Sequence, residues 1–204
     1  MIFNENLTLS NKLPELPDSN TFINVDMNSF GVTAGSSSSP VLKSIGMNTC
    51  VYLGLYDRAN KVAGVSHISV PLLRVKNFWE IDKSVDEEII EVLKTMKKNG
   101  SYINRKGIQV VVIGGHIDRG GADFLNYPLH SIVLGRLSQI GFQKPEIIIP
   151  YENGDCFNIA LDSRDGFTYK LKDIKPLNNT RFDALRMQMG SLKPHITSDT
   201  RSLK

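Results

Sequence analysis

The feature that most constrains this sequence is a pair of alternating segments joined by a short polar turn. The segments cover residues 51–57 and 61–71, and residues 57–60 form a four-residue turn between them. This turn predicts a β-hairpin in which Cys50 lies directly across from His67. Successive side chains point to opposite faces of a strand, so a one-residue slip would reverse every side chain. The apolar pattern therefore decides which residues share a face.

One face of the predicted hairpin is apolar enough to pack on a core, and the other carries a thiol and an imidazole. The apolar face holds Val51, Leu53, Leu55, Val62, Gly64, Ser66, Ile68 and Val70. The opposite face holds Cys50, Tyr52, Gly54, Tyr56, Lys61, Ala63, Val65, His67 and Ser69. Directly opposed residues have Cβ atoms about 4.5–5.5 Å apart, within reach of a thiol–imidazole contact. The hairpin therefore predicts a nucleophile–base pair.

Length and charge exclude several other classes of protein. The chain has 204 residues and a net charge of +3, which indicates one ordinary domain and argues against nucleic acid as a partner. No apolar run reaches the roughly 20 residues of a membrane span, and no basic-then-apolar leader precedes the domain. These features predict a cytoplasmic protein with no membrane insertion. Two distant cysteines and four histidines without carboxylate spacing predict neither a metal site nor a cofactor.

The remaining segments predict an α/β fold of the α+β type, with antiparallel and mixed sheet and two principal helices flanking the hairpin. Expected strands cover 21–27 with an extension over 30–35, then 109–113, 146–150 and a hairpin of 157–161 with 167–171. Residues 72–83 are expected to be a loop. Ser84 and Glu87 form a capping-box pattern that predicts a helix start at Ser84. A second helix is expected from Pro128 to Ile140, closed by Gly141.

Each cysteine must be weighed against a structural role. A lone buried cysteine on a strand is more often part of the core than a nucleophile. For Cys50 the spacing to His67 favours the catalytic interpretation. Cys156 follows a loop, has no such partner in the sequence pattern, and is expected to be structural.

The hairpin carries a longer motif, Ser44-x-Gly46-x-x-x-Cys50, which is followed, seventeen positions after the cysteine, by His67-x-x-Val70-Pro71. This motif resembles the signature of the CheD family of chemoreceptor glutamine deamidases. The resemblance extends through the helix at 86–98 and a strand ending in Gly114-Gly115, to about residue 172. The family carries threonine where Ser44 stands and a small turn where this chain has Met47-Asn48-Thr49. The resemblance implies a bacterial chemotaxis protein whose substrate is a helical chemoreceptor, with a chemotaxis phosphatase as a further partner.

The residues themselves suit this chemistry. A thiol titrates near pH 8.5, so an adjacent imidazole is needed to deliver a thiolate at neutral pH. Cys50 is then the nucleophile, His67 the base, and Ser44 the group that orients the imidazole. Backbone N–H groups of the turn at Gly46, Asn48 and Thr49 are expected to hold an oxyanion and position the substrate.

Two alternatives to a chemoreceptor deamidase stay open from the sequence. One is a secreted effector that deamidates a host protein, since deamidating bacterial toxins share the hydrolase fold that the resemblance implies. The other is a CheD-like binding module with little turnover. The expected organisation is a mobile lead over 1–20, a deamidase domain over 21–174, and a basic extension over 175–204 with an optional short helix.

Overall fold

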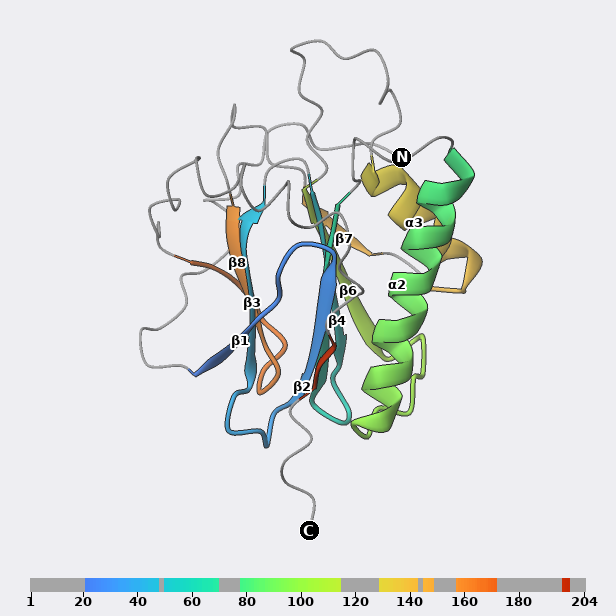
Figure 1. Cartoon of the computed structure of the whole chain (residues 1–204). Helices are drawn as coiled ribbons and strands as arrows, with labels where there is room; N and C mark the ends of the chain where they lie inside the picture. Colours follow the sequence, from blue (N-terminus) through green and yellow to red (C-terminus); the bar gives the residue numbers. More distant parts are fainter. Residues whose placement is uncertain are drawn as a thin grey trace.

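The computed structural model describes residues 21–47, 50–69, 78–114, 129–142, 145–148, 157–171 and 196–198. These residues form two β-sheets and two helices, arranged as three layers (Figure 1). A four-stranded sheet, called sheet A, packs on one face of a six-stranded sheet, called sheet B, and the helices cover the other face of sheet B. The predicted α+β class, with mixed sheet and two flanking helices, is confirmed. The lead at 1–20, and the optional helix of the basic extension, lie outside the described residues.

Sheet B holds the predicted hairpin at its centre. Its strand order is β10-β2-β5-β4-β6-β7, and all neighbours are antiparallel except the parallel outer pairs β10–β2 and β6–β7. The bounds are β2 Ser29–Ala34, β4 Val51–Asp57, β5 Val62–Ile68, β6 Ile108–Gly114, β7 Glu146–Ile148 and β10 Ile196–Ser198. The sequence pattern did not predict β10.

Sheet A has the order β1-β3-β8-β9, with β1 parallel to β3 and the other neighbours antiparallel. Its strands are β1 Phe22–Asn24, β3 Val41–Met47, β8 Phe157–Asp162 and β9 Thr168–Lys170. The last two form the hairpin predicted from the sequence. The chain alternates between sheets over β1 to β4, because β1 and β3 lie in sheet A whereas β2 and β4 lie in sheet B.

The predicted register of the central hairpin is wrong by two residues. Tyr52, not Cys50, pairs with His67, and the last pair before the turn is Asp57 with Val62. Asp57 stays in the strand because its Oδ1 accepts the N–H groups of Ala59 and Asn60, at 3.1 and 3.2 Å. The turn therefore uses residues 58–61. A two-residue shift preserves the parity of the strands, so the two predicted faces are correct.

Two other boundaries differ from the prediction. The strand expected over 21–27 with an extension does not continue, because Asn28 adopts a left-handed φ of 57° and turns the chain from sheet A to sheet B. Helix α2 spans Phe78–Lys98, so residues 78–83 are helical instead of part of the predicted loop, and Ser84 lies inside the helix instead of capping it. The rest of the predicted loop, residues 72–77, lies outside the described residues. Lys83 Nζ and Glu87 Oε1 form an i,i+4 ion pair at 3.7 Å, which spans the helix start predicted at Ser84.

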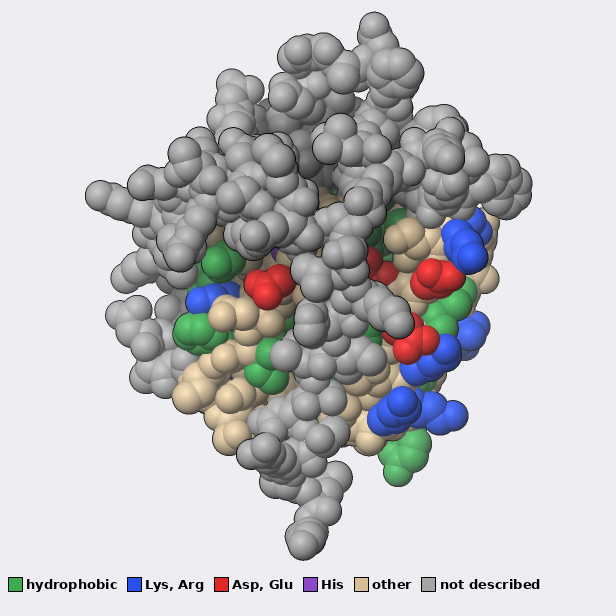
Figure 2. Space-filling view, in the orientation of Figure 1, with side chains coloured by type: hydrophobic (Ala, Val, Ile, Leu, Met, Phe, Trp, Pro, Cys, Tyr) green, Lys and Arg blue, Asp and Glu red, His purple; other side chains and the backbone are tan. Residues whose placement is uncertain are grey.

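The hairpin face predicted to be apolar packs against the helices. Val51, Leu53 and Leu55 join side chains of α2 and of α3, which spans Leu129–Gln139, in one buried cluster. A Cβ on Gly64 would lie 2.7 Å from Val92 Cγ1, so the glycine lets α2 approach β5 closely. Acidic and basic side chains gather over the helical layer on the face that Figure 2 shows.

The opposite hairpin face is also core, because it packs against sheet A. This second cluster comprises Val25, Leu42, Met47, Cys50, Tyr52, Tyr56, Ala63, Val65, Ile113, Ile159 and Leu161. The thiol face of the hairpin is therefore enclosed between two sheets. Neither α2 nor α3 is both long and apolar enough to cross a lipid bilayer, and no other described helix meets that requirement.

Candidate active site

A hydrogen bond between the two sheets joins Ser44 to His67. Ser44 Oγ, on β3 of sheet A, lies 2.8 Å from His67 Nδ1, on β5 of sheet B. Both residues are buried, with relative exposures of 0% and 2%. Polar groups buried this deeply are stable only when they are hydrogen-bonded, so the contact contributes to the packing of the sheets as well as to the orientation of the ring.

The partners of Ser44 indicate which imidazole nitrogen carries the proton. Ser44 Oγ also lies 3.2 Å from the carbonyl oxygen of Val25, which can only accept a hydrogen bond. The hydroxyl therefore donates to Val25 and accepts from His67 Nδ1–H. We infer this tautomer from the network, and it leaves the lone pair on Nε2. His67 Nε2 is buried and has no hydrogen-bond partner among the described residues.

Burial keeps the imidazole neutral. Removal of water lowers the pKa of His67 to about 4, and the Val25 backbone, which favours the protonated ring, only partly opposes this shift. At neutral pH the ring is therefore uncharged and ready to accept a proton at Nε2.

Cys50 lies one residue before β4, on the same face of the hairpin as His67. Its side chain is 6% exposed and belongs to the buried cluster between the sheets. Since Val51 pairs with Ile68, Cys50 is diagonal to His67 across the hairpin. Diagonal neighbours have backbone positions about 7–8 Å apart, a separation that long side chains on one face can span. The structure thus replaces the predicted direct pairing of Cys50 and His67 by a diagonal one.

Tyr52 occupies the position directly opposite His67. A Cβ on Gly54 would lie 3.0 Å from Tyr52 Cε1, so the ring folds over the glycine two residues along the strand. Complete burial raises the pKa of Tyr52, and the side chain remains an uncharged phenol. The ring belongs to the buried cluster between the sheets, on the hairpin face that also carries His67.

The backbone of Cys50 is held by the end of β6. Gly114 pairs with Val51 and has a φ of 98°, a conformation that favours glycine. A Cβ at Gly114 would lie only 2.3 Å from the carbonyl oxygen of Cys50. A larger residue at this position would therefore displace the chain that carries the thiol.

The structure assigns Gly46 a different contact from the one expected. Its N–H donates to Asn158 Oδ1 at 3.0 Å, so this N–H is already engaged and does not point at an oxyanion. Asn48 and Thr49 lie outside the described residues. The sequence analysis missed Asn158, although an asparagine between Phe157 and Ile159 is unusual for a buried strand and could have marked it.

No group of three or more His, Cys, Asp or Glu side chains in the described part of the chain is arranged to hold a metal ion.

Sequence comparison identifies relatives of one family. Proteins from two strains of Clostridium botulinum, each named probable chemoreceptor glutamine deamidase CheD, are 32% and 37% identical over 80 residues. That match covers 39% of this chain and 48% of each relative, so the chain matches about half the length of these curated proteins. A protein of the same name from Methanococcus maripaludis is 26% identical over 151 residues, covering 71% of this chain and 90% of the relative. No protein-family model matches the sequence.

Two solved structures show weak similarity. The hypothetical protein YfiH of Bacillus licheniformis has a TM-score of 0.40 at 14% identity, over 60% of this chain and 50% of the other. YlmD of Geobacillus stearothermophilus has a TM-score of 0.40 at 9% identity, over 61% and 50% of the two chains. Similarity at this level assigns neither fold nor function. The resemblance to the CheD family that the Ser44, Cys50 and His67 pattern predicted is confirmed by the curated relatives that carry this name.

Proposed function

We propose that this protein is a cysteine-dependent deamidase that converts glutamine side chains of proteins to glutamate. The main support is the 2.8 Å contact of Ser44 Oγ with His67 Nδ1, because it leaves Nε2 as the basic nitrogen on the face that carries Cys50. The names of the curated relatives support glutamine as the target and a chemoreceptor as the substrate.

The first step is attack by the sulfur of Cys50 on the carboxamide carbon of a glutamine. As the S–C bond forms, the thiol proton moves to His67 Nε2. The neutral imidazole acts as a general base during attack, because a ring with a pKa of about 4 does not hold a proton at neutral pH before substrate binds. The carbonyl oxygen becomes an oxyanion, which backbone N–H groups next to the nucleophile stabilise. Asn48 and Thr49 are the proposed donors, since the Gly46 N–H is engaged by Asn158.

The second step expels ammonia. His67 Nε2–H gives its proton to the amide nitrogen as the C–N bond breaks, and a thioester with Cys50 remains. Water then attacks the thioester carbon while the neutral imidazole takes a proton from the water. As the resulting tetrahedral intermediate collapses, the C–S bond breaks and the imidazolium returns that proton to the sulfur. The balanced reaction consumes one water, releases one ammonia and leaves a glutamate side chain with the thiol regenerated.

Ser44 has an orienting role in this sequence. Its hydroxyl accepts a hydrogen bond from His67 Nδ1–H and donates one to the Val25 carbonyl oxygen. These two contacts hold the ring with Nε2 towards the face that carries the thiol. When the ring is protonated, the same contacts stabilise the imidazolium, as the third member of a catalytic triad does.

The test compares the wild type with Cys50→Ser and, as a matched control, Cys156→Ser, whose position lies outside the described residues. Each protein is incubated with a purified chemoreceptor cytoplasmic domain, and ammonia release and the amide-to-acid mass change are measured. We expect Cys50→Ser to lose roughly 10⁴-fold or more of the rate and Cys156→Ser to keep the wild-type rate. Equal rates for the wild type and Cys50→Ser would exclude the proposed nucleophile.

A further inference from the structure

We propose that Asn158 is a positioning residue that sets the register of β3, and through it the relative placement of Ser44 and Cys50. This inference rests on the proposed function and adds a residue to it. The observation is an irregularity in β3 at the point where the strand approaches Cys50, opposite Asn158 on β8, its neighbour in sheet A (Figure 1).

The irregularity is a β-bulge. Ser44 pairs with Ile159 and Met47 with Phe157, so three steps along β3 match two steps along β8. Two residues of β3, Ile45 and Gly46, therefore stand opposite the single residue Asn158. Gly46 has a φ of 71° in the bulge, a left-handed conformation typical of glycine at such positions.

The side chain of Asn158 replaces the ladder contact that the bulge removes. Its Oδ1 accepts the Gly46 N–H at 3.0 Å, and its own backbone carbonyl accepts the N–H of Leu171 at 2.8 Å. Asn158 is only 9% exposed and Gly46 is half-buried, so a Gly46 N–H without an acceptor would lower the stability of this region. Asn158 is thus fixed by the chain beside it and in turn fixes the bulge.

The bulge lies between the two groups that must act together. Ser44 is two residues before Gly46, and Cys50 is four residues after it. A one-residue slip of a strand turns each side chain to the opposite face. If the bulge formed at another residue of β3, either the Ser44 side chain would turn away from His67 or the chain leading to Cys50 would leave the strand in the wrong orientation. The hydrogen bond from the Gly46 N–H to Asn158 therefore maintains the placement of both Ser44 and Cys50.

The informative variants either remove or retain the acceptor. Asn158→Leu removes it while keeping the number and branching of the side-chain heavy atoms, and Asn158→Asp retains an oxygen for the Gly46 N–H. Thr168→Val is the matched control: Thr168 is buried in the same sheet and its hydroxyl has no hydrogen-bond partner among the described residues. All variants are made in a Cys156→Ser background, so that iodoacetamide reports on Cys50 alone. Circular dichroism checks that each variant is folded.

We expect Asn158→Leu to lower kcat by roughly 10- to 100-fold with a KM within about threefold of wild type, because small misplacement of reacting groups costs about 100-fold in rate. Asn158→Asp should restore kcat to within about threefold at neutral pH, and Thr168→Val should match the wild type. The rate of Cys50 alkylation should change in Asn158→Leu and return in Asn158→Asp. A purely structural role would lower the yield of folded protein without this split between kcat and KM.

A folded Asn158→Leu protein with wild-type kcat and a wild-type alkylation rate would overturn the positioning role. If Asn158→Leu does not fold, Asn158→Ser replaces it, since the shorter hydroxyl does not reach the Gly46 N–H. A wild-type kcat in that variant would overturn the role equally. Should the wild type release no ammonia at all, the deamidase proposal fails. The alkylation rates then still decide whether Asn158 positions Cys50.

Discussion

At the scale of single residues, the hydroxyl of Ser44 is the group that selects the tautomer of the His67 imidazole. It is the hydrogen-bonded neighbour of His67 Nδ1 and it donates onwards to Val25, so it defines the tautomer that makes Nε2 a base. The hydroxyl, rather than the serine side chain as a whole, carries this role. Threonine could supply it as well.

Ser44→Ala and Ser44→Thr separate the hydroxyl from the rest of the side chain. We expect Ser44→Ala to lower kcat by roughly 10- to 100-fold, because the imidazole loses part of its orientation. Ser44→Thr should keep most of the activity and lose about 1 kcal/mol of unfolding free energy, since its extra methyl enters a fully buried site. The measurements are steady-state deamidation and urea unfolding. Loss of activity in Ser44→Thr equal to that in Ser44→Ala would contradict this role.

At the scale of elements, the segment carrying Cys50 is held between the bulge of β3 and the end of β6. The sequence predicted which side chains share a face of the hairpin, because apolar parity is unchanged by a shift of two residues. It did not predict the pairing of Tyr52 with His67, since that depends on the carboxylate of Asp57 accepting N–H groups within the turn. Local patterns also could not predict the contact of Asn158 with Gly46, which are 112 positions apart.

Substitution of Gly114 tests the second support of Cys50. In Gly114→Ala the new Cβ would meet the Cys50 carbonyl oxygen at 2.3 Å, and φ of 98° is strained for alanine. We expect a loss of about 1–3 kcal/mol of unfolding free energy and a drop in deamidation at temperatures where the variant is folded. Gly135→Ala is the control, because that glycine lies in α3 with nothing within 4 Å of the new Cβ. It should stabilise by about 0.5–1 kcal/mol. Equal effects of the two substitutions would refute the close contact.

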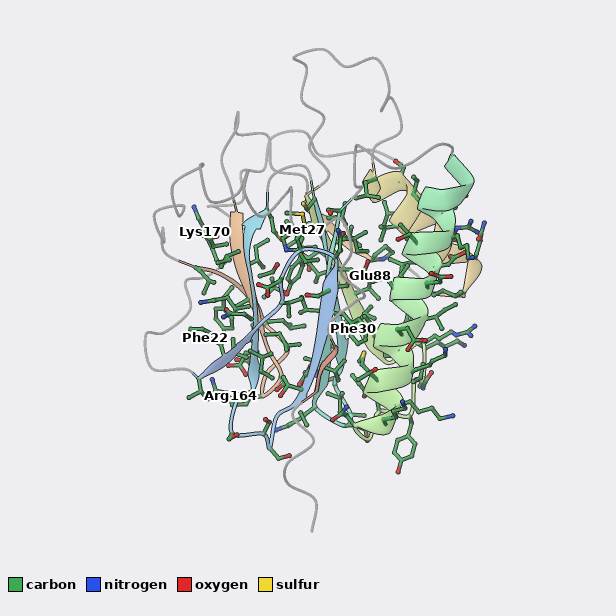
Figure 3. The ribbon with its side chains drawn as sticks, viewed as in Figure 1. Phe22, Met27, Phe30, Glu88, Arg164 and Lys170 are labelled. Atoms are coloured by element: carbon green, nitrogen blue, oxygen red, sulfur yellow. The ribbon has the colours of Figure 1, made fainter. Side chains whose placement is uncertain are left out.

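At the scale of the whole molecule, a half-buried carboxyl group and a buried imidazole on opposite faces of sheet B influence stability in opposite directions. Glu88 of α2 lies between the helix and sheet B and is hydrogen-bonded to Ser66 of β5 (Figure 3). Burial raises the pKa of Glu88 to about 7, against a smaller opposing effect of the Ser66 hydrogen bond. Burial lowers the pKa of His67 to about 4. Each group is therefore neutral in the fold near pH 6.

The signs of these two contributions follow from proton binding. His67 binds fewer protons when folded, so its contribution to stability is complete above pH 6.5 and is lost as pH falls towards 4. Glu88 binds more protons when folded, so its contribution is complete below pH 4.5 and is lost as pH rises through 7. Between pH 4.5 and 6.5 the two contributions change the unfolding free energy in opposite directions as pH rises.

Glu88→Gln should remove the contribution of Glu88 to the pH dependence of stability and leave that of His67. We expect the urea midpoint of the variant, compared with wild type, to rise more steeply between pH 4.5 and 7.5. Glu87→Gln is the control, since the Glu87 side chain is 67% exposed on the same helix. Its pH dependence should match the wild type. An unchanged pH dependence in Glu88→Gln would show that the folded state does not favour protonated Glu88.

The exchange of the chain between the two sheets has a consequence for the order of assembly. Ser44 reaches His67 only when β3 of sheet A has docked on β5 of sheet B, and Cys50 lies on the connection between those sheets. The β4–β5 hairpin closes a short loop and can form early during folding, whereas docking of the sheets requires contacts between distant segments. An isolated hairpin would therefore contain the thiol and the imidazole without the hydroxyl that orients them. The complete arrangement of the proposed catalytic groups therefore arises late in folding, when the layers meet.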